Sequence, residues 1–373
     1  MNPLEIQAAD VYVVGPDVER FRFSSDMGAV FETLTIVKIT TADGGTSIGG
    51  MTLFSENDFD TSLGESLRSL LPAIIGRSAK DPSAITQHLI GRYNSMSPKP
   101  QGVIDIALWD RLAKARQEPL YKTLGGTRSR MPAYASLPLS DTVDGYLAAI
   151  RLMADEHQFD TFKLHGWCEL APDLELINRL LDTFGNKTFR FILDLEERYL
   201  LKDAITIAKA LESLSCPWIE APLPDTDLDG YRQLRSATTI PIIPAGNTLE
   251  SMGLVRLGVA ANAWDGIRVD GTYAGGISQV KAIIEYGESQ GLPTELQAWG
   301  YTLSQATNLH LSLASPKTRF FELPVPYGPH EACALNPIRA KNGWVSAPEG
   351  FGLGIDVDWV AVEQDLLLHY RIA

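Results

Sequence analysis

Thr161-Phe162-Lys163-Leu164-His165 is a short run in which a lysine and a histidine alternate with apolar residues. In a strand, side chains two residues apart share a face, so Lys163 and His165 point one way and Phe162 and Leu164 the other. A cation beside an imidazole lowers the proton affinity of the imidazole, which suits this face to proton transfer. A solvated edge strand has the same pattern, so the surrounding sequence has to decide between the two.

Repeated strand and helix patterns follow from Met131 onward. Short apolar runs alternate with amphipathic helical patterns, and the polar residues at or just after these runs recur every 23 to 29 residues. This spacing indicates repeated strand-plus-helix units. With a further run at 133–136 it predicts an eight-stranded (β/α) barrel over residues 131–339. The other strands are expected at 161–165, 191–194, 218–220, 242–244, 266–269, 295–297 and 320–322.

Polar side chains stand at the carboxyl ends of these expected strands, where barrels of this kind carry their active sites. Any one of them could be structural, and Asp270 before Gly271 also fits a plain turn. Their occurrence in order on successive strands is harder to explain that way. We therefore expect one mouth of the barrel to gather Lys163, His165, Asp194, Glu220, Asn247, Asp270 and Glu322.

The first 130 residues have a different pattern and predict an α+β domain. Runs at 11–14 and 34–40 are rich in β-branched residues, and Asp43-Gly44-Gly45 is typical of a hairpin turn. Residues 21–28 are expected to form a loop. From 62 to 115 apolar residues recur at helical spacing and predict core-facing stripes. These stripes are Leu63, Leu67, Leu70 and Leu71, and later Ile104, Ala107, Leu108 and Leu112.

Composition limits the possible partners and compartment. The chain has 373 residues and a net charge of −14, which argues against nucleic acid or an anionic membrane as the main partner. An anionic small molecule stays possible where a metal or a local cation overrides the global charge. The three cysteines are widely spaced and predict no disulfide framework. Without a signal peptide or an apolar run of membrane-spanning length, a cytoplasmic protein is expected.

The order of motifs resembles the enolase superfamily, close to its mandelate racemase and muconate lactonising enzyme branch. The resemblance covers nearly the whole chain and rests on Ala107-Leu108-Trp109-Asp110, Leu124-Gly125-Gly126, Lys163-x-His165, Asp194, Trp218-Ile219-Glu220-x-Pro222, Asp270 with Gly275-Gly276-Ile277, and Glu322. It implies a capping domain, residues 1–130, over the barrel mouth, with residues from about 340 to 373 returning to it. It also implies that loops near 21–28 and 50–58 touch a small carboxylate substrate, and that the chain forms a homo-oligomer.

Chemistry of this family begins by removing the proton α to a carboxylate, with Mg²⁺ as cofactor. Removal of that proton places a second negative charge on the carboxylate oxygens, and a hard cation stabilises it. Carried over by position, the metal ligands are Asp194, Glu220 and Asn247. His165 takes the place of the base with Lys163 as its neighbouring cation. Glu322 takes the place of an acid that donates to the substrate carboxylate, and Asp270 that of the strand-six aspartate.

Two departures from the family pattern matter. Asn247 supplies a neutral amide where an acidic ligand is expected, so the metal site would carry one charge less. No histidine occupies the strand-seven segment 295–301, so Asp270 has no partner there and acts as a catalytic, a substrate-contact or a structural residue. Arg268 stands where the muconate lactonising branch has lysine.

Three functions follow from these observations. The leading hypothesis is dehydration of a hydroxy acid, a sugar acid or a hydroxylated amino or imino acid, because this reaction needs a base on only one face of the substrate. A racemase or epimerase is the alternative if Glu295, Tyr301 or Lys163 serves the second face. A carboxylate-binding descendant with impaired catalysis is the third. Trp299 and Tyr301 fit either a site wall or packing, and His330 is expected to be a solvated loop residue.

Overall fold

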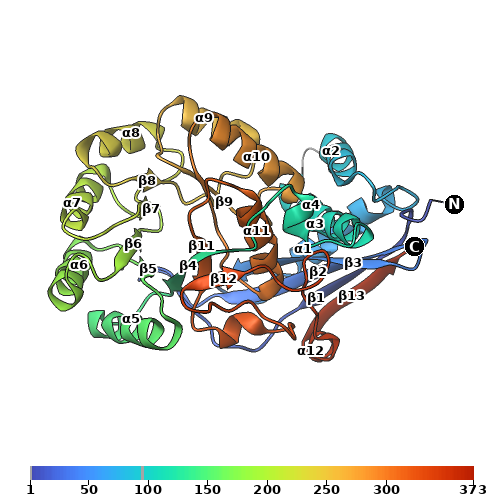
Figure 1. Cartoon of the computed structure of the whole chain (residues 1–373), viewed down its shortest axis with the longest axis horizontal. Coiled ribbons are helices and arrows are strands. Elements are labelled where there is room, and N and C mark those ends of the chain that lie inside the picture. Colours follow the sequence, from blue (N-terminus) through green and yellow to red (C-terminus); the bar gives the residue numbers. More distant parts are fainter. Residues whose placement is uncertain (1, 94–95) are drawn as a thin grey trace.

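The computed structural model describes residues 2–93 and 96–373. One part, from green to orange in Figure 1, repeats strand and helix, and the other holds the blue N-terminal strands together with the red C-terminal strand. The two parts pack against each other through α11 (Thr302–Ala314) on β3 (Thr46–Ser55) and α10 (Ile277–Ser289) on α3 (Pro98–Ala115). None of the helices in the described ranges is both long enough and apolar enough to cross a bilayer.

An antiparallel sheet in the order β13-β1-β2-β3 forms the core of the second part. Its strands are β1 (Ile6–Val14), β2 (Phe31–Thr41), β3 and β13 (Leu366–Ile372). The expected hairpin turn joins β2 to β3: Gly44 has a φ of 79°, and the Asp43 carboxylate accepts a bond from the Gly45 amide. A positive φ at this place suits glycine because it has no Cβ.

Helices cover this sheet with the apolar stripes that the sequence predicts. The stripes lie on α1 (Ser62–Leu70), the short η1 (Leu71–Ala73) and α3, while α2 (Pro82–Arg92) and α4 (Leu120–Thr123) pack against α3. All eight stripe residues are at most 7% exposed. A Cβ on Gly49 of β3 would lie 2.3 Å from the Val103 carbonyl oxygen, so glycine there lets α3 approach the sheet closely.

All eight predicted barrel strands are present, and a helix lies between each strand and the next. The strands are β4 (Arg130–Leu137), β5 (Thr161–His165), β6 (Arg190–Asp194), β7 (Ile219–Glu220), β8 (Ile242–Ile243), β9 (Ile267–Val269), β10 (Thr294–Leu296) and β11 (Phe321–Pro324). The helices are α5 (Val143–His157), α6 (Leu170–Phe184), α7 (Leu201–Leu211), α8 (Leu228–Ala237), α9 (Met252–Ala260), α10 and α11. The fold is therefore a (β/α) barrel with an N-terminal α+β capping domain.

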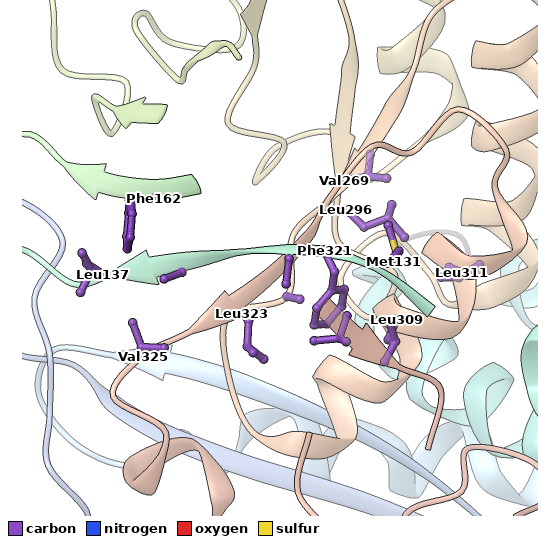
Figure 2. Packing of buried hydrophobic residues seen from close by; sticks show 14 of the residues in the cluster. Met131, Leu137, Phe162, Val269, Leu296, Leu309, Leu311, Phe321, Leu323 and Val325 are labelled. Atoms are coloured by element: carbon purple, nitrogen blue, oxygen red, sulfur yellow. The ribbon is translucent and has the colours of Figure 1, made fainter. Parts of the chain in front are cut away.

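Strand pairing in the barrel is continuous in the order β11-β4-β5-β6-β7-β8, and β9 pairs separately with β10. Between β8 and β9 the Asp265 amide donates to the Ile242 carbonyl, and between β10 and β11 the Ala298 amide donates to Glu322 Oε2. The barrel wall is packed outside by its helices. Figure 2 shows Leu309 and Leu311 of α11 and Phe321 of β11, which belong to one cluster of buried apolar side chains.

The C-terminal segment divides between the two parts. β12 (Trp344–Ser346) pairs with β4 of the barrel, and α12 (Trp359–Gln364) follows it. The strand that pairs with β1 starts only at Leu366. The expected return to the capping domain from about residue 340 is thus wrong for 344–346. The boundary at residue 130 stays a prediction.

An apolar layer fills the barrel interior below the strand ends. It consists of Tyr134, Ile192, Trp218, Ile243 and Phe320, all buried. Three of them stand two residues before Asp194, Glu220 and Glu322 and so share a strand face with those carboxylates. The layer separates the carboxylates from solvent on the lower side and leaves the capping side as their approach.

Candidate active site

A cavity of about 220 Å³ lies between the barrel mouth and the capping domain. The barrel contributes polar residues from several strand ends, and the capping domain contributes residues from the 21–30 segment and from β3. The lining consists of Phe23, Met27, Val30, Phe54, Lys163, His165, Asp194, Glu196, Asn247, Gln297, Trp299 and Glu322. Both loops expected near the substrate therefore reach this cavity.

Lys163 is the central cation of the site. Its Nζ lies 2.9 Å from Asp194 Oδ2, 2.8 Å from Glu220 Oε1 and 2.8 Å from Glu322 Oε1, and its side chain is 4% exposed. Burial alone would lower the pKa of Lys163, but the three carboxylates raise it well above its usual value. Lys163 is thus held as an ammonium ion that ties β5 to β6, β7 and β11.

Arg268 of β9 is a second buried cation beside Lys163. Its Nη2 donates to Glu322 Oε2 over 2.9 Å, and its Nε lies 2.9 Å from Glu220 Oε1 without hydrogen-bond alignment. Glu322 also accepts from Ser136 Oγ and from the Ala298 amide. Burial alone would raise the pKa of Glu322, but Lys163 and Arg268 lower it well below its usual value. In this arrangement Glu322 is a carboxylate that accepts hydrogen bonds, which does not favour the predicted acid role.

His165 is a neutral imidazole with a fixed orientation. Its Nδ1 lies 2.7 Å from the Leu137 carbonyl oxygen, which can only accept, so Nδ1 carries the proton and Nε2 has a free lone pair. Burial, and then the Lys163 charge, lower the pKa of His165 to about 3. The predicted effect of the neighbouring lysine is present, although burial contributes more. Tyr146 of α5 donates to the His165 carbonyl over 2.6 Å and fixes this end of β5.

Glu196, which the sequence analysis did not identify, lies beside His165. Its Oε1 is 3.4 Å from His165 Nε2, while Asp194 Oδ2 is 3.7 Å from the same nitrogen. The Glu196 backbone has a φ of 48°, and its amide donates to Asp194 Oδ1. Burial, and then the Asp194 charge, raise the pKa of Glu196 well above its usual value. Its position two residues after Asp194 was the only signal in the sequence.

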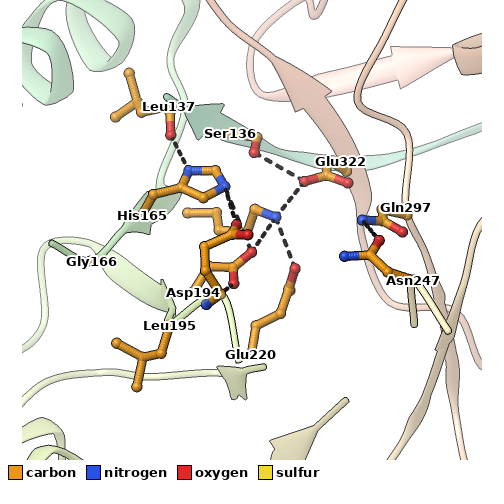
Figure 3. Close-up of polar contacts among 12 residues, drawn as sticks. Ser136, Leu137, His165, Gly166, Asp194, Leu195, Glu220, Asn247, Gln297 and Glu322 are labelled. Carbon is orange, nitrogen blue, oxygen red and sulfur yellow. Dashed lines mark hydrogen bonds and ion pairs between the residues drawn. The ribbon is translucent and has the colours of Figure 1, made fainter. Parts of the chain in front are cut away.

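The predicted metal ligands are not all brought together. Asp194 and Asn247 line the cavity, whereas Glu220 is bound by Lys163 and Arg268 and accepts from Trp218 Nε1 over 3.0 Å. Asn247 Oδ1 accepts from Gln297 Nε2 over 3.0 Å. Figure 3 shows His165 and Asp194 on one side of the site and the Asn247–Gln297 pair on the other.

Asp270 does not line the cavity. Its Oδ1 accepts from the Thr272 amide, from Thr272 Oγ1 and from Asn308 Nδ2, at 2.6, 2.7 and 3.1 Å. These bonds hold the turn after β9, so Asp270 has a structural role here, one of the three roles that its sequence position allows. The expected catalytic role is not supported, because local hydrogen bonds occupy the carboxylate and keep it out of the mouth.

The candidates for a second base are also occupied. Glu295 is buried and pairs with Arg319 Nε at 2.7 Å, and Tyr301 donates its hydroxyl to the Glu32 carbonyl. Lys163 is surrounded by carboxylates. Among the described residues that line the cavity, the groups able to accept a proton near the base are Asp194 and Glu196, and both lie on the His165 side.

A buried Glu32–His330 pair stands behind the cavity wall at Trp299. Trp299 Nε1 donates to Glu32 Oε1 over 3.2 Å, and Glu32 Oε2 lies 3.9 Å from His330 Nδ1. His330 is 1% exposed, so the expectation of a solvated loop histidine is wrong: Phe21 stacks on it and Trp299 packs edge-on against it. Of the two aromatic residues left open, Trp299 walls the cavity and Tyr301 packs behind it.

Glu32 is expected to make folding stability depend on pH. Burial raises the pKa of Glu32 to about 7, partly offset by the bond from Trp299, while the unfolded value is near 4.5. Because the pKa of Glu32 is higher in the folded than in the unfolded protein, its carboxyl group contributes to stability. This contribution is complete below about pH 4.5 and is lost as the pH rises through 7. Relative to Glu32→Gln, which keeps the acceptor for Trp299, the wild type should lose about 3 kcal/mol of unfolding free energy between these limits.

Urea unfolding from pH 5 to 8 measures this difference. His330, Tyr301 and Tyr273 face Glu32 and stay present in both proteins, so their titration largely cancels. Glu19→Gln, at an exposed position, is the matched control and should track the wild type. If the difference in unfolding free energy between the wild type and Glu32→Gln does not change with pH, Glu32 is already ionised at pH 5.

Comparison with known proteins agrees with this architecture. Residues 8–125 match the family described as mandelate racemase/muconate lactonizing enzyme, N-terminal domain, and residues 145–361 match the family described as enolase C-terminal domain-like. A crystal structure of a mandelate racemase/muconate lactonizing enzyme-type protein from Pseudovibrio sp. is 33% identical, with a TM-score of 0.95 over 98% of each chain. The chain belongs to the mandelate racemase/muconate lactonizing enzyme branch of the enolase superfamily.

More distant relatives catalyse different reactions. D-galactarolactone cycloisomerase of Agrobacterium fabrum is 27% identical over 282 residues, which are 72% of this chain and 73% of that protein. The structure of L-talarate/galactarate dehydratase from Salmonella typhimurium has a TM-score of 0.88 at 21% identity, over 99% of this chain and 93% of that one, and shares the fold. Other relatives are named as racemases and epimerases. The chain is thus an enzyme of the superfamily, and its own reaction has to be argued from the site.

Proposed function

We propose that the protein removes the proton α to the carboxylate of a small hydroxy acid and then eliminates water. His165 Nε2 takes the α-proton, the electron pair forms the bond between the α- and β-carbons, and the β-hydroxyl leaves with a proton returned by the same imidazole. From a substrate that also carries an α-hydroxyl group the product is an enol, which becomes a 2-keto acid. One observation carries the proposal: His165 is neutral, has a fixed tautomer and presents a free lone pair to the cavity.

Elimination is favoured over racemisation by the position of the proton-transfer groups. Asp194 and Glu196 lie next to His165, and the opposite side holds the Asn247–Gln297 amides, which do not exchange protons as bases do. Racemisation through two bases needs a group on each face of the substrate. Elimination needs one, because the imidazolium formed in the first step serves as the acid in the second.

The charge of the cavity supports a bound cation. The carboxylates of Asp194, Glu220 and Glu322 outnumber the two buried cations, Lys163 and Arg268, so an anionic substrate would meet net negative charge even before Glu196 is counted. Carboxylate and amide oxygens suit Mg²⁺, and structures of a related L-talarate/galactarate dehydratase mutant and of a Streptomyces coelicolor racemase contain it. Asp194 and Glu196, whose oxygens lie close together beside His165, would hold the ion here. When bound, it offsets the negative charge that develops on the substrate carboxylate.

Mg²⁺ affinity is expected to depend more on Glu196 than on Glu220. Glu196→Gln should weaken Mg²⁺ binding about 10- to 100-fold, while Glu220→Gln, which alters a partner of Lys163, should weaken it less. Calorimetric titration of Mg²⁺ without substrate measures both affinities, with unfolding midpoints as the check on folding. A larger loss in Glu220→Gln would instead support the set Asp194, Glu220 and Asn247 predicted from the family resemblance.

Incubation of hydroxy acids, sugar acids and amino-acid derivatives in D₂O with Mg²⁺ tests the proposed reaction. A 2-keto acid, or deuterium at the α-carbon, is the expected product. Racemised but otherwise unchanged substrate would favour the epimerase alternative. No reaction, together with no uptake of Mg²⁺ at high concentration, would favour a carboxylate-binding descendant that has lost catalysis.

A further inference from the structure

The two sides of the cavity differ sharply in polarity. The barrel side contributes charged and amide groups, whereas the capping domain contributes only Phe23, Met27, Val30 and Phe54 to the described lining. Trp299 adds a fifth apolar surface from the barrel. Resting on the proposed function, we infer that the substrate is a carboxylate whose end remote from the reacting carbon is apolar, with an aromatic ring as the best fit.

Polar side chains of the capping loop are engaged away from the cavity. Arg22 pairs with Asp141 at 2.5 Å, and Asp26 pairs with Arg198 at 3.1 Å. Ser25 Oγ donates to the Trp167 carbonyl. Hydroxyl and charged groups are thus present in this loop, but they anchor it to the barrel loops.

Neighbouring polar groups are occupied in the same way. Ser24 Oγ donates to Asp26 Oδ1, and Glu56 accepts from the Gly28 amide. Trp299 Nε1, the remaining donor on the apolar side, is taken by Glu32. A substrate rich in hydroxyl groups would therefore find no hydrogen-bond partner among the described side chains of this wall.

Aromatic rings form a continuous surface over the base. The Phe23 ring centroid lies 5.2 Å from that of His165, 5.0 Å from that of Trp299 and 6.4 Å from that of Phe54. The contacts with Trp299 and Phe54 are edge-to-face, the arrangement that aromatic rings prefer. A substrate ring next to the reacting carbon can extend this packing, whereas a polyol would bury hydroxyl groups without partners.

A matched pair of substrates tests the inference. 2,3-Dihydroxy-4-phenylbutanoate and 2,3,4,5-tetrahydroxypentanoate carry the same reacting carbons and differ in the remote end. With Mg²⁺ present, kcat/KM for 2-keto acid formation should favour the phenyl compound by roughly 100-fold. Equal rates, or a preference for the tetrahydroxy acid, would overturn the inference.

A substitution in the apolar wall should shift this preference. Phe54→Asn places an amide on the apolar side and should move the kcat/KM ratio toward the tetrahydroxy acid by about tenfold. Phe351→Asn, at an aromatic residue that is 51% exposed, is the matched control and should leave the ratio unchanged. An unchanged ratio in folded Phe54→Asn protein would count against a role of this wall in specificity.

Binding of 4-phenylbutanoate, which has no hydroxyl to eliminate, separates the two proposals. Calorimetric binding of this compound without α-deuteration or turnover of any acid would support the apolar site and overturn the proposed reaction. Turnover of the tetrahydroxy acid without binding of 4-phenylbutanoate would overturn the apolar site and leave the reaction standing.

Discussion

Replacing His165 by asparagine is expected to reduce α-proton exchange and 2-keto acid formation by roughly 10²- to 10⁴-fold. The asparagine amide can still donate to the Leu137 carbonyl, so the local hydrogen bond survives in part. It has no basic lone pair in place of Nε2. The loss should be near the upper end of this range, because the described cavity lining offers no second base on the opposite face.

Exchange of substrate deuterium followed by NMR measures this effect directly. His369→Asn is the matched control, because His369 lies on β13 with its side chain 41% exposed, and it should keep wild-type exchange. Mg²⁺ affinity and the unfolding midpoint establish that the His165→Asn protein is folded. Exchange that persists at the wild-type rate would remove His165 from its assigned role and point to Glu196.

Replacing Lys163 by methionine is expected to lower the free energy of unfolding by about 3–5 kcal/mol. Methionine has a similar length but no charge. Asp194, Glu220 and Glu322 would then share one buried cation, Arg268, which reaches only two of them. A buried carboxylate without a partner lowers the free energy of unfolding far more than the loss of a surface ion pair does. Activity should fall as well, because the three carboxylates lose the lysine that holds them together.

Urea denaturation of the variant gives the unfolding free energy. Lys281→Met is the control: Lys281 pairs with Glu285 in an exposed i,i+4 position, and its loss should change stability by no more than about 0.5 kcal/mol. Adding Glu220→Gln to Lys163→Met should cost less than the two separate losses together, since it removes one of the stranded charges. Strict additivity would mean that Lys163 and Glu220 do not interact energetically.

Much of the architecture was predictable because strand periodicity and chain order are local properties. The eight strands follow from apolar runs at regular intervals, and parallel strands joined by helices bring their carboxyl ends to one mouth. Lys163, His165, Asp194 and Glu322 lie at the site for this reason. The same rule placed Asn247 on the cavity, although nothing local to it predicts the bond from Gln297.

Partner choice could not be predicted, because it depends on distances between segments far apart in the chain. Asp270 has the right position on its strand, yet Thr272 and Asn308 bind its carboxylate in place. Glu220 likewise points inward as expected, but Lys163 and Arg268 hold it below the cavity. His330 follows an ordinary loop sequence, and only its packing against Phe21 and Trp299 reveals that it is buried.

The sequence alone determined the Thr161–His165 strand, the side-chain face that holds Lys163 and His165, and the barrel around them, because side-chain alternation and strand spacing depend on near neighbours. Tertiary structure alone decided that His165 is neutral with Nε2 free, that Glu196 stands beside it, and that the capping loop presents its apolar side chains to the cavity. The burial of a side chain, the charges near it and its hydrogen-bond partners all depend on segments that meet only in the folded chain. These surroundings decide what chemistry a residue can perform.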